Sequence, residues 1–244
     1  MTTQQPSLSQ LDLERFGVIT AKHNSVTAES LDSILQFCHN NAVQLLIARC
    51  STFDLATAQA MEKHGFALMD TLVYYVRKFA KGPIPQADGP VTIRSIQPGE
   101  AEAVEAIARE SFRGYYGHYH ADSRLPREAC DEVYVSWAYN SCLSKAFADE
   151  VLVADTGEQL AGFATLRLNT PDEGEGVLFG VAPFAQGMGI YRSFMIHGMQ
   201  WCLAQGAKQM VVSTQITNIA VQKVWVRLGF EPSHSVYTFH KWFD

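Results

Sequence analysis

The sequence predicts an α/β protein that consists of two related halves. Three features support this fold class. Strand-like and helix-like patterns alternate along most of the 244 residues. A turn that contains Gly187 and Gly189 separates an apolar run from a helical pattern. A strand–helix unit of the N-terminal part recurs in the C-terminal part. A chain of this length can bury a core as one large domain or as two small ones.

The N-terminal part is expected to alternate strands and helices after a frayed tail at residues 1–8. The expected elements are a short strand or hairpin over residues 11–21, a helix over 28–41 capped by Thr27, a buried strand over 43–50, a helix over 55–64 stopped by Gly65, and a strand over 66–77. Prolines and glycines then mark residues 81–90 as a linker.

The C-terminal part continues the alternation. The expected elements are a strand over 91–96, a helix over 100–112, a loop rich in aromatic residues and histidine over 113–125, a helix from Pro126 to about 147, a hairpin of strands 151–155 and 160–168, a strand over 176–182, a helix over 190–205, a strand over 209–214, a helix over 218–228 and a strand over 235–242. Pro126 suits a first helical position, where the missing N–H has no partner in any case.

An internal repeat relates the two parts. Residues 54–66 align with residues 218–230, each segment ends in Gly-Phe, and a strand that contains Val-Tyr follows each one. We therefore expect an incomplete copy over residues 1–80, a linker over 81–90 and a complete domain over 91–244. Chance similarity of two such units is the alternative. The first copy has no counterpart of Gln186–Gly189 and is not expected to bind the same ligand.

Composition excludes several function classes. The formal net charge of −6 argues against a general nucleic-acid binder, which needs a basic excess. The N-terminus lacks the pattern of a signal peptide, and no apolar run approaches the roughly 20 residues that span a bilayer. The five cysteines are widely spaced and form no metal-like pair. These features predict a cytoplasmic protein that binds neither metal nor membrane.

The glycine turn is a candidate anion site. The first N–H groups of a helix lack partners and carry partial positive charge, and glycine lets a phosphate approach the backbone closely. A lone Gly-x-Gly is weak evidence by itself. Its neighbours extend it to Gln186-Gly-Met-Gly-Ile-Tyr191, with Asn218 and Leu228-Gly-Phe230 following in order.

This set of motifs, in this order of elements from Val91 onward, resembles the GNAT acyltransferase superfamily. The resemblance covers roughly residues 91–244. It implies an α+β fold with a mixed, mostly antiparallel sheet that splays at an acyl-CoA site, and it makes the N-terminal part a degenerate GNAT-like half. Residues 113–141 narrow the likeness to the nucleotide-amino-sugar N-acyltransferases, such as the TDP-fucosamine acetyltransferases.

The resemblance implies acyl-CoA as co-substrate, with acetyl-CoA expected first and a longer or hydroxylated short acyl group as the alternative. The pyrophosphate is expected on the backbone of the glycine turn, and the pantetheine arm beside the strand that precedes it. The N–H near Val181 would polarise the thioester carbonyl. The expected CoA-binding residues are Phe179, Val181, Gln186, Gly187, Met188, Gly189, Ile190, Tyr191 and Asn218.

The chemistry also needs a base, because a free amine is mostly protonated at neutral pH. His118 and His120 are the candidate bases, and Glu175 is a competitor; a structural or solvated loop residue is the alternative for each histidine. For the acceptor, arginines suit a diphosphate and aromatic rings suit a base or a sugar face, although aromatic clusters more often serve packing. The expected acceptor-binding residues are Arg113, Tyr116, Tyr119, Arg124 and Arg127.

Two residues depart from the family pattern. Many members carry a tyrosine that protonates the thiolate where this chain has Trp225, whose indole cannot do so. Tyr191 replaces the last small residue of the glycine motif. If Tyr191 points outward, pyrophosphate binding is unaffected; if it points inward, the CoA must shift or the hydroxyl becomes a phosphate ligand or a proton donor.

The expected function is transfer of an acyl group to the amine of a nucleotide-linked amino-deoxy sugar, with dTDP as the expected nucleotide. The alternatives are a peptide or small-amine acceptor and a non-catalytic acyl-CoA-binding protein. The expected partner is the small-molecule acceptor, with no nucleic acid or membrane. Edge strands make a homo-oligomer an open option.

Overall fold

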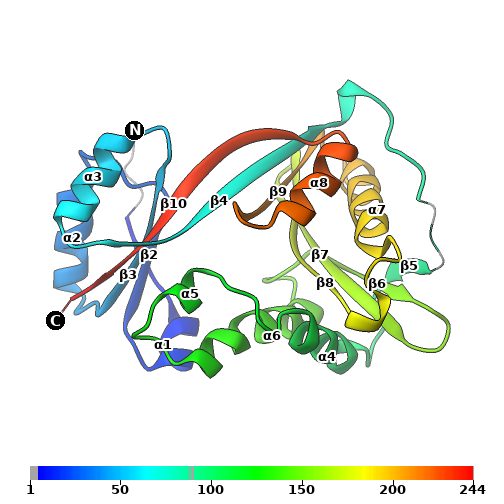
Figure 1. Cartoon of the computed structure of the whole chain (residues 1–244), viewed down its shortest axis with the longest axis horizontal. Coiled ribbons are helices and arrows are strands. Elements are labelled where there is room, and N and C mark those ends of the chain that lie inside the picture. Colours follow the sequence, from blue (N-terminus) through cyan, green and yellow to red (C-terminus); the bar gives the residue numbers. More distant parts are fainter. Residues whose placement is uncertain (1–4, 88, 90, 244) are drawn as a thin grey trace.

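The computed structural model describes residues 5–87, 89 and 91–243. Its described residues build one ten-stranded sheet in the order β1-β2-β3-β10-β4-β9-β8-β7-β6-β5 (Figure 1). The β2–β3 and β8–β9 pairs are parallel and the other neighbours are antiparallel. The expected mixed, mostly antiparallel sheet is therefore confirmed.

The elements follow the expected alternation in both parts of the chain. Up to residue 81 they are β1 (Ser7–Leu8), α1 (Gln10–Phe16), β2 (Thr20–His23), α2 (Leu31–Asn40), β3 (Leu45–Ser51), α3 (Leu55–Lys63), β4 (Ala67–Lys78) and a 3₁₀ turn (Phe79–Lys81). Beyond it they are β5 (Thr92–Ser95), α4 (Ala101–Ser111), α5 (His118–Ala121), α6 (Arg127–Leu143), β6 (Glu150–Asp155), β7 (Leu160–Thr170), β8 (Glu173–Val181), a 3₁₀ turn (Pro183–Ala185), α7 (Ile190–Ala204), β9 (Gln209–Gln215), α8 (Ile219–Arg227) and β10 (Glu231–Trp242).

The expectation for residues 11–21 is wrong, because most of this stretch is helix α1. The side chain of Ser9 accepts the N–H of Asp12 and caps the helix, and Gly17 ends it with φ of +66°. Helix α2 also begins later than expected. Thr27 and Ser30 each accept the other's backbone N–H, which forms a turn before the helix starts.

Several other boundaries differ from the expectation, such as the starts of β8 at Glu173 and of β10 at Glu231 rather than at residues 176 and 235. The loop over residues 113–125 contains the short helix α5, and α6 ends at Leu143 rather than near residue 147. In the N-terminal tail, residues 1–4 lie outside the described chain, and Ser7–Leu8 form β1 at the edge of the sheet.

The two halves of the chain exchange their last strands. Strand β10 lies between β3 and β4, so that Thr238 faces both Arg49 and Asp70. Strand β4, from the N-terminal half, pairs with β9 of the C-terminal half, where Leu72 faces Gln215. These two strands, each of 12 residues, run side by side between the halves (Figure 1). The sheet is continuous because of this exchange.

Helices cover both faces of the sheet. Helices α2 and α3 pack on the N-terminal strands, and α7 and α8 pack on the C-terminal strands (Figure 1). Helices α4 and α6 pack on the other face of the C-terminal strands, in a cluster that also includes Ile47 of β3 and residues of α5. Among the described residues, none of the helices combines the length and apolar character that crossing a bilayer requires.

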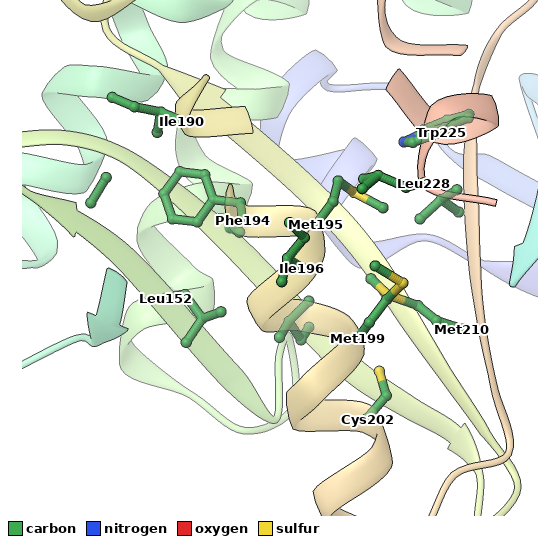
Figure 2. Close-up of a cluster of buried hydrophobic side chains, with 14 of the residues drawn as sticks. Leu152, Ile190, Phe194, Met195, Ile196, Met199, Cys202, Met210, Trp225 and Leu228 are labelled. Atoms are coloured by element: carbon green, nitrogen blue, oxygen red, sulfur yellow. The ribbon is translucent and has the colours of Figure 1, made fainter. Parts of the chain in front are cut away.

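Helix α7 is fixed to the sheet by a dense apolar face. Phe194, Met195 and Met199 are fully buried, and Trp225 of α8 is 2% exposed beside them (Figure 2). Burial of each such side chain stabilises the fold by about 1.5–3 kcal/mol. Because α7 begins directly after the glycine turn, this packing also fixes the turn in place.

Candidate active site

The sheet opens between β8 and β9, as expected. These parallel strands pair only from Glu173 opposite Gln209 to Gly176 opposite Val212. From Val177 onward β8 pairs with β7 alone, while β9 continues along β4. The separation leaves a gap at the carboxyl ends of two neighbouring parallel strands, where open α/β sheets commonly bind ligands.

The last residues of β8 point backbone donors into this gap. Leu178 and Ala182 direct their N–H groups toward β7, onto the Thr165 hydroxyl and the Ala161 carbonyl. Because the donors alternate along a strand, the N–H groups of Phe179 and Val181 point the other way, toward the gap. They are therefore placed to bond an extended ligand that lies beside β8.

The glycine turn has the geometry of an anion site. Gly187 and Gly189 have φ of +83° and +78°, and a Cβ added to either would meet no atom within 4 Å. The first N–H to find a backbone acceptor is that of Ser193, which donates to Gly189 at 3.0 Å. Within the described chain, the N–H groups of residues 187–192 have no backbone acceptor and remain available. They lie at the N-terminus of the 15-residue helix α7.

Tyr191 points inward and contacts Trp225, so the two residues that depart from the family pattern form a pair. The Trp225 indole N–H donates to the Tyr191 hydroxyl at 2.9 Å, and the Tyr191 ring lies 5.4 Å from that of Phe179. Burial raises the pKa of Tyr191, which keeps its hydroxyl protonated at neutral pH. The hydroxyl accepts the indole N–H and keeps its own proton to donate.

Asn218 stands at the N-terminus of α8 without capping it. Its side-chain amide donates to the Thr214 hydroxyl of β9 at 3.1 Å. This bond holds the amide beside the carboxyl end of β9, one of the two strands that border the gap.

A cavity of about 1050 Å³ lies on the face of the sheet that α1, α5 and α6 cover. It includes Val177 and Ser213 at the gap and extends past β4 and β10 to Arg49 of β3. Both halves of the chain therefore line one cavity. Pockets for drug-sized ligands have volumes of about 300–1,000 Å³, so this cavity can hold a ligand at the upper end of that size range.

Of the three candidate bases, His118 and Glu175 line the cavity, and His118 has a ring nitrogen there that bonds to none of the described residues. The Asp122 carboxylate accepts from His240 Nδ1 at 2.7 Å, and His240 Nε2 accepts from His118 Nδ1 at 2.9 Å. In the described part of the chain the other ring nitrogen, His118 Nε2, has no bonding partner. Burial, followed by interaction with His240, Arg49 and Lys22, lowers the pKa of His118 well below its ordinary value, so its ring is neutral and the Nε2 lone pair can accept a hydrogen bond.

The other two candidates for the base are engaged elsewhere. His120 Nδ1 accepts the N–H of Gly117 at 3.2 Å, and its Nε2 donates to Asp131 at 3.0 Å, so both nitrogens serve to hold α5. The described residues that line the cavity do not include His120. Glu175 lines the cavity, and Arg167 binds its carboxylate at 2.7 Å.

Of the five expected acceptor-binding residues, only Tyr119 is among the described residues that line the cavity. Its hydroxyl donates to Asp12 at 3.1 Å and accepts from Lys22 at 2.9 Å. The other four lie on or near the loop surface. Arg113 and Tyr116 are exposed, Arg124 stacks on the Trp242 ring, and Arg127 lies over the Tyr116 ring and near Asp131.

Asp70 was missed because it belongs to the half that lacks the glycine motif. It lies on β4, in alternation with Leu72 and Tyr74, which line the cavity, but Asp70 is not itself among the described lining residues. Both of its carboxylate oxygens are buried, and neither has a hydrogen-bond partner among the described residues. Burial, with a contribution from the Asp70 charge, raises the pKa of Tyr115 to about 12. The signal that could have identified it is an acidic residue in the middle of the predicted strand over 66–77.

Solved structures share this architecture. A GCN5-related N-acetyltransferase from Sphaerobacter thermophilus superposes with a TM-score of 0.65 at 15% identity, over 92% of this chain and 72% of the other. A tandem GNAT protein from the clavulanic acid biosynthesis pathway has a TM-score of 0.63 at 14% identity, over 93% and 76%. At this level of identity the likeness establishes the fold alone.

Curated proteins of related sequence carry two kinds of name. The spore coat polysaccharide biosynthesis protein SpsD of Bacillus subtilis (strain 168) is 27% identical over 146 residues, which cover 60% of this chain and 49% of that protein. A mycothiol acetyltransferase from Nocardioides sp. is 24% identical over 187 residues, covering 72% and 62%. The chain thus spans about half to three-fifths of the length of these relatives.

The match to a family model covers more than half of the chain. Residues 102–230 fit the model of the acetyltransferase (GNAT) family, and this range contains the glycine turn, the gap between β8 and β9, and Asn218. The match, the fold and the gap agree, and the chain is a member of the acetyltransferase (GNAT) family.

Proposed function

We propose that this protein transfers an acetyl group from acetyl-CoA to the amine of a nucleotide-linked amino-deoxy sugar, with TDP as the nucleotide. The cavity carries the proposal, because it continues from the gap in the sheet across both halves and leaves room for an acceptor far larger than a simple amine. The polysaccharide-biosynthesis name of the SpsD relative supports an activated sugar as acceptor.

In the proposed reaction the pyrophosphate of acetyl-CoA lies on the N–H groups of residues 187–192, and the pantetheine arm lies along Phe179 and Val181. The Val181 N–H donates to the thioester oxygen and stabilises the negative charge that develops on it. The acceptor nitrogen attacks the carbonyl carbon, and the C–S bond breaks as the amide forms.

The acceptor nitrogen loses two protons in this reaction, and the thiolate gains one. The acceptor arrives as an ammonium ion, which the carboxylate of Asp70 attracts, and its first proton passes through His118 Nε2 to solvent. The departing thiolate takes the proton of the Tyr191 hydroxyl, which Trp225 holds in position, and the second proton of the nitrogen, released as the amide forms, returns to the Tyr191 oxygen. The Tyr191–Trp225 pair thus replaces the tyrosine that many family members carry at the position of Trp225.

We place the reaction in the cytoplasm. All five cysteines are free thiols and four of them are buried, which is typical of proteins from a reducing compartment. Acetyl-CoA and nucleotide sugars are then available to the same protein.

The test is release of free CoA thiol when the protein receives acetyl-CoA together with TDP-linked 3-amino or 4-amino deoxyhexoses. Turnover that depends on the sugar, with the acetylated product identified by mass spectrometry, would support the proposal. Absence of turnover across this panel with several short acyl-CoA donors would refute it.

A small amine is the second candidate acceptor, because the match to a relative named mycothiol acetyltransferase extends over more of this chain than the match to SpsD does. Parallel reactions with small amines distinguish the two.

A further inference from the structure

The two ends of the cavity differ in charge. At the C-terminal end, Arg167 pairs with Glu175 at 2.7 Å, and Glu173 accepts from Gln209 at 2.8 Å and from Asn169 at 3.1 Å. These carboxylates are therefore satisfied by neighbouring side chains. Lys78, which faces Gln209 across the sheet, also lines this end, so that among the residues described there the two cations balance the two carboxylates.

The end formed by the N-terminal half carries an excess of positive charge. Arg15, Lys22 and Arg49 all line it, whereas Asp12 is the only carboxylate among the described residues that line this end. Asp12 lies 2.6 Å from Lys22 and 3.9 Å from Arg15. A single carboxylate, that of Asp12, is thus the ion-pair partner of two of the three cations.

Arg49 has no carboxylate partner in the described part of the chain. Its Nε donates to the Thr238 hydroxyl at 3.3 Å, and its Nη1 reaches Asn24 at 3.5 Å, both long contacts with neutral groups. A guanidinium group presents five donors in a planar fork that fits a phosphate or carboxylate. Most of that fork remains available to a ligand in the cavity.

The register of the sheet relates Arg49 to the gap. Arg49 faces Thr238 of β10, Thr238 faces Asp70 of β4, and the next strand is β9, which borders the gap. Adjacent strands lie about 4.8 Å apart, so the backbones at Arg49 and Asp70 are separated by about 10 Å. A molecule with an amine at one end and an anion at the other fits this separation.

We propose that Arg49, together with Lys22 and Asn24, forms an anion site in the N-terminal half that binds a phosphate group of the acceptor. The assignment of the anion to the acceptor rests on the proposed function; the anion site itself rests on the charges that line the cavity. The degenerate half then has a role in the reaction, because it selects acceptors that carry an anionic group at a fixed distance from the amine.

The site is tested by calorimetric titration of inorganic pyrophosphate, and separately of malonate, into protein saturated with CoA. Saturation occupies the glycine turn, so the added anion reports on a second site. We expect pyrophosphate to bind the unaltered protein and Arg49→Gln to weaken this binding at least tenfold, because a charged hydrogen-bonding partner is lost. Binding of malonate without binding of pyrophosphate would also support an anion site, but one that binds a carboxylate group.

Arg227→Gln is the matched control, since Arg227 is exposed on α8 and lies outside the described lining of the cavity. It should bind pyrophosphate as the unaltered protein does. Arg49→Lys keeps the charge and loses the fork, so it should give an intermediate affinity and serves if the glutamine variant does not fold. Equal affinity in Arg49→Gln, or binding of neither anion to the unaltered protein, would overturn the proposal.

Steady-state kinetics separate this inference from the proposed function. If a TDP-amino sugar is the substrate, Arg49→Gln should raise its KM at least tenfold and leave the KM of acetyl-CoA unchanged. Loss of pyrophosphate binding in a protein that acetylates no TDP-amino sugar leaves the anion site standing without the proposed acceptor. Unchanged kinetics on an active TDP-amino sugar leaves the acceptor standing and removes the anion site.

Discussion

The environment of Asp70 is unfavourable for folding and is better explained by a role in ligand binding. A buried carboxylate without a donor destabilises a protein, because the interior does not replace the hydration that the charge loses. Both of its oxygens are buried without a donor among the residues that the structure describes. Evolved proteins accept such a cost mainly at sites that bind ligands, where a donor arrives with the substrate.

We therefore expect Asp70→Asn to stabilise the protein and to impair it as an enzyme. Removal of the unpaired charge should raise the free energy of unfolding by about 1–3 kcal/mol, measured by urea unfolding at pH 7. Loss of the carboxylate should lower kcat/KM for the acceptor at least tenfold, because the ammonium loses its counter-charge.

Asp172→Asn is the matched control for this change. Asp172 is exposed and pairs with Lys208 at 2.9 Å, so its removal should change the unfolding free energy by less than about 0.5 kcal/mol and leave the kinetics unchanged. A loss of stability in Asp70→Asn would contradict the interpretation, since it would mean that the carboxylate has donors in solution.

At the scale of single elements, helix α7 joins the core to the ligand site. Its buried face packs on the sheet, and its N-terminus presents the N–H groups of the glycine turn. A glycine with positive φ stands at each end of the helix. Gly189 has φ of +78° before it, and Gly206 has φ of +91° after it, and a Cβ added to either meets no atom within 4 Å.

This symmetry gives a matched pair of variants. Gly189→Ala and Gly206→Ala should each cost about 1–2 kcal/mol of unfolding free energy, because both place a side chain in the left-handed region without a clash. Only Gly189→Ala should also raise the KM of acetyl-CoA, at least about tenfold, since relaxation of the turn displaces donors from the phosphate. Thermal unfolding and steady-state kinetics measure the two effects. Equal KM values in the two variants would show that the turn does not bind the cofactor.

The elements most accessible to prediction were those with strong local signals. The glycine turn, the start of α6 after Pro126 and the ends of α3 and β8 follow from residues that act locally. Residues 10–16 failed because the cap at Ser9 determines this helix, while its apolar residues alone suggested a strand. The sequence could not show which of His118 and His120 reaches the cavity, because the residues that distinguish them, His240 and Asp131, are brought to them by the fold.

At the scale of the whole molecule, the exchange of strands is the feature that sequence could not provide. Both halves end in similar strands, Val73-Tyr74 in β4 and Val236-Tyr237 in β10, so the local pattern does not indicate which half each strand joins. The register with β9 and β3 makes that choice. As a result the cavity has walls from both halves, and residues such as Asp70 and Arg49 could not be placed near the gap from motifs alone.

The same exchange predicts that the chain unfolds as one unit. Strand β4 is bonded to β10 and β9, and β10 is bonded to β3, so neither half can lose its structure without leaving strands of the other unpaired. Calorimetry should therefore show a single transition with a van't Hoff enthalpy close to the calorimetric enthalpy, although many chains above about 150 residues deviate from two-state unfolding.

The variant Val236→Pro is a direct probe, because proline removes a bond of the central ladder at a residue that faces Ser51 and Leu72. It should lower the transition temperature of the whole chain. Proline at Leu8, in the two-residue edge strand β1, is the control and should change it little. Two resolved transitions in the unaltered protein, or a Val236→Pro variant in which one half melts early and the other keeps its original transition temperature, would show that the halves are independent domains despite the shared sheet.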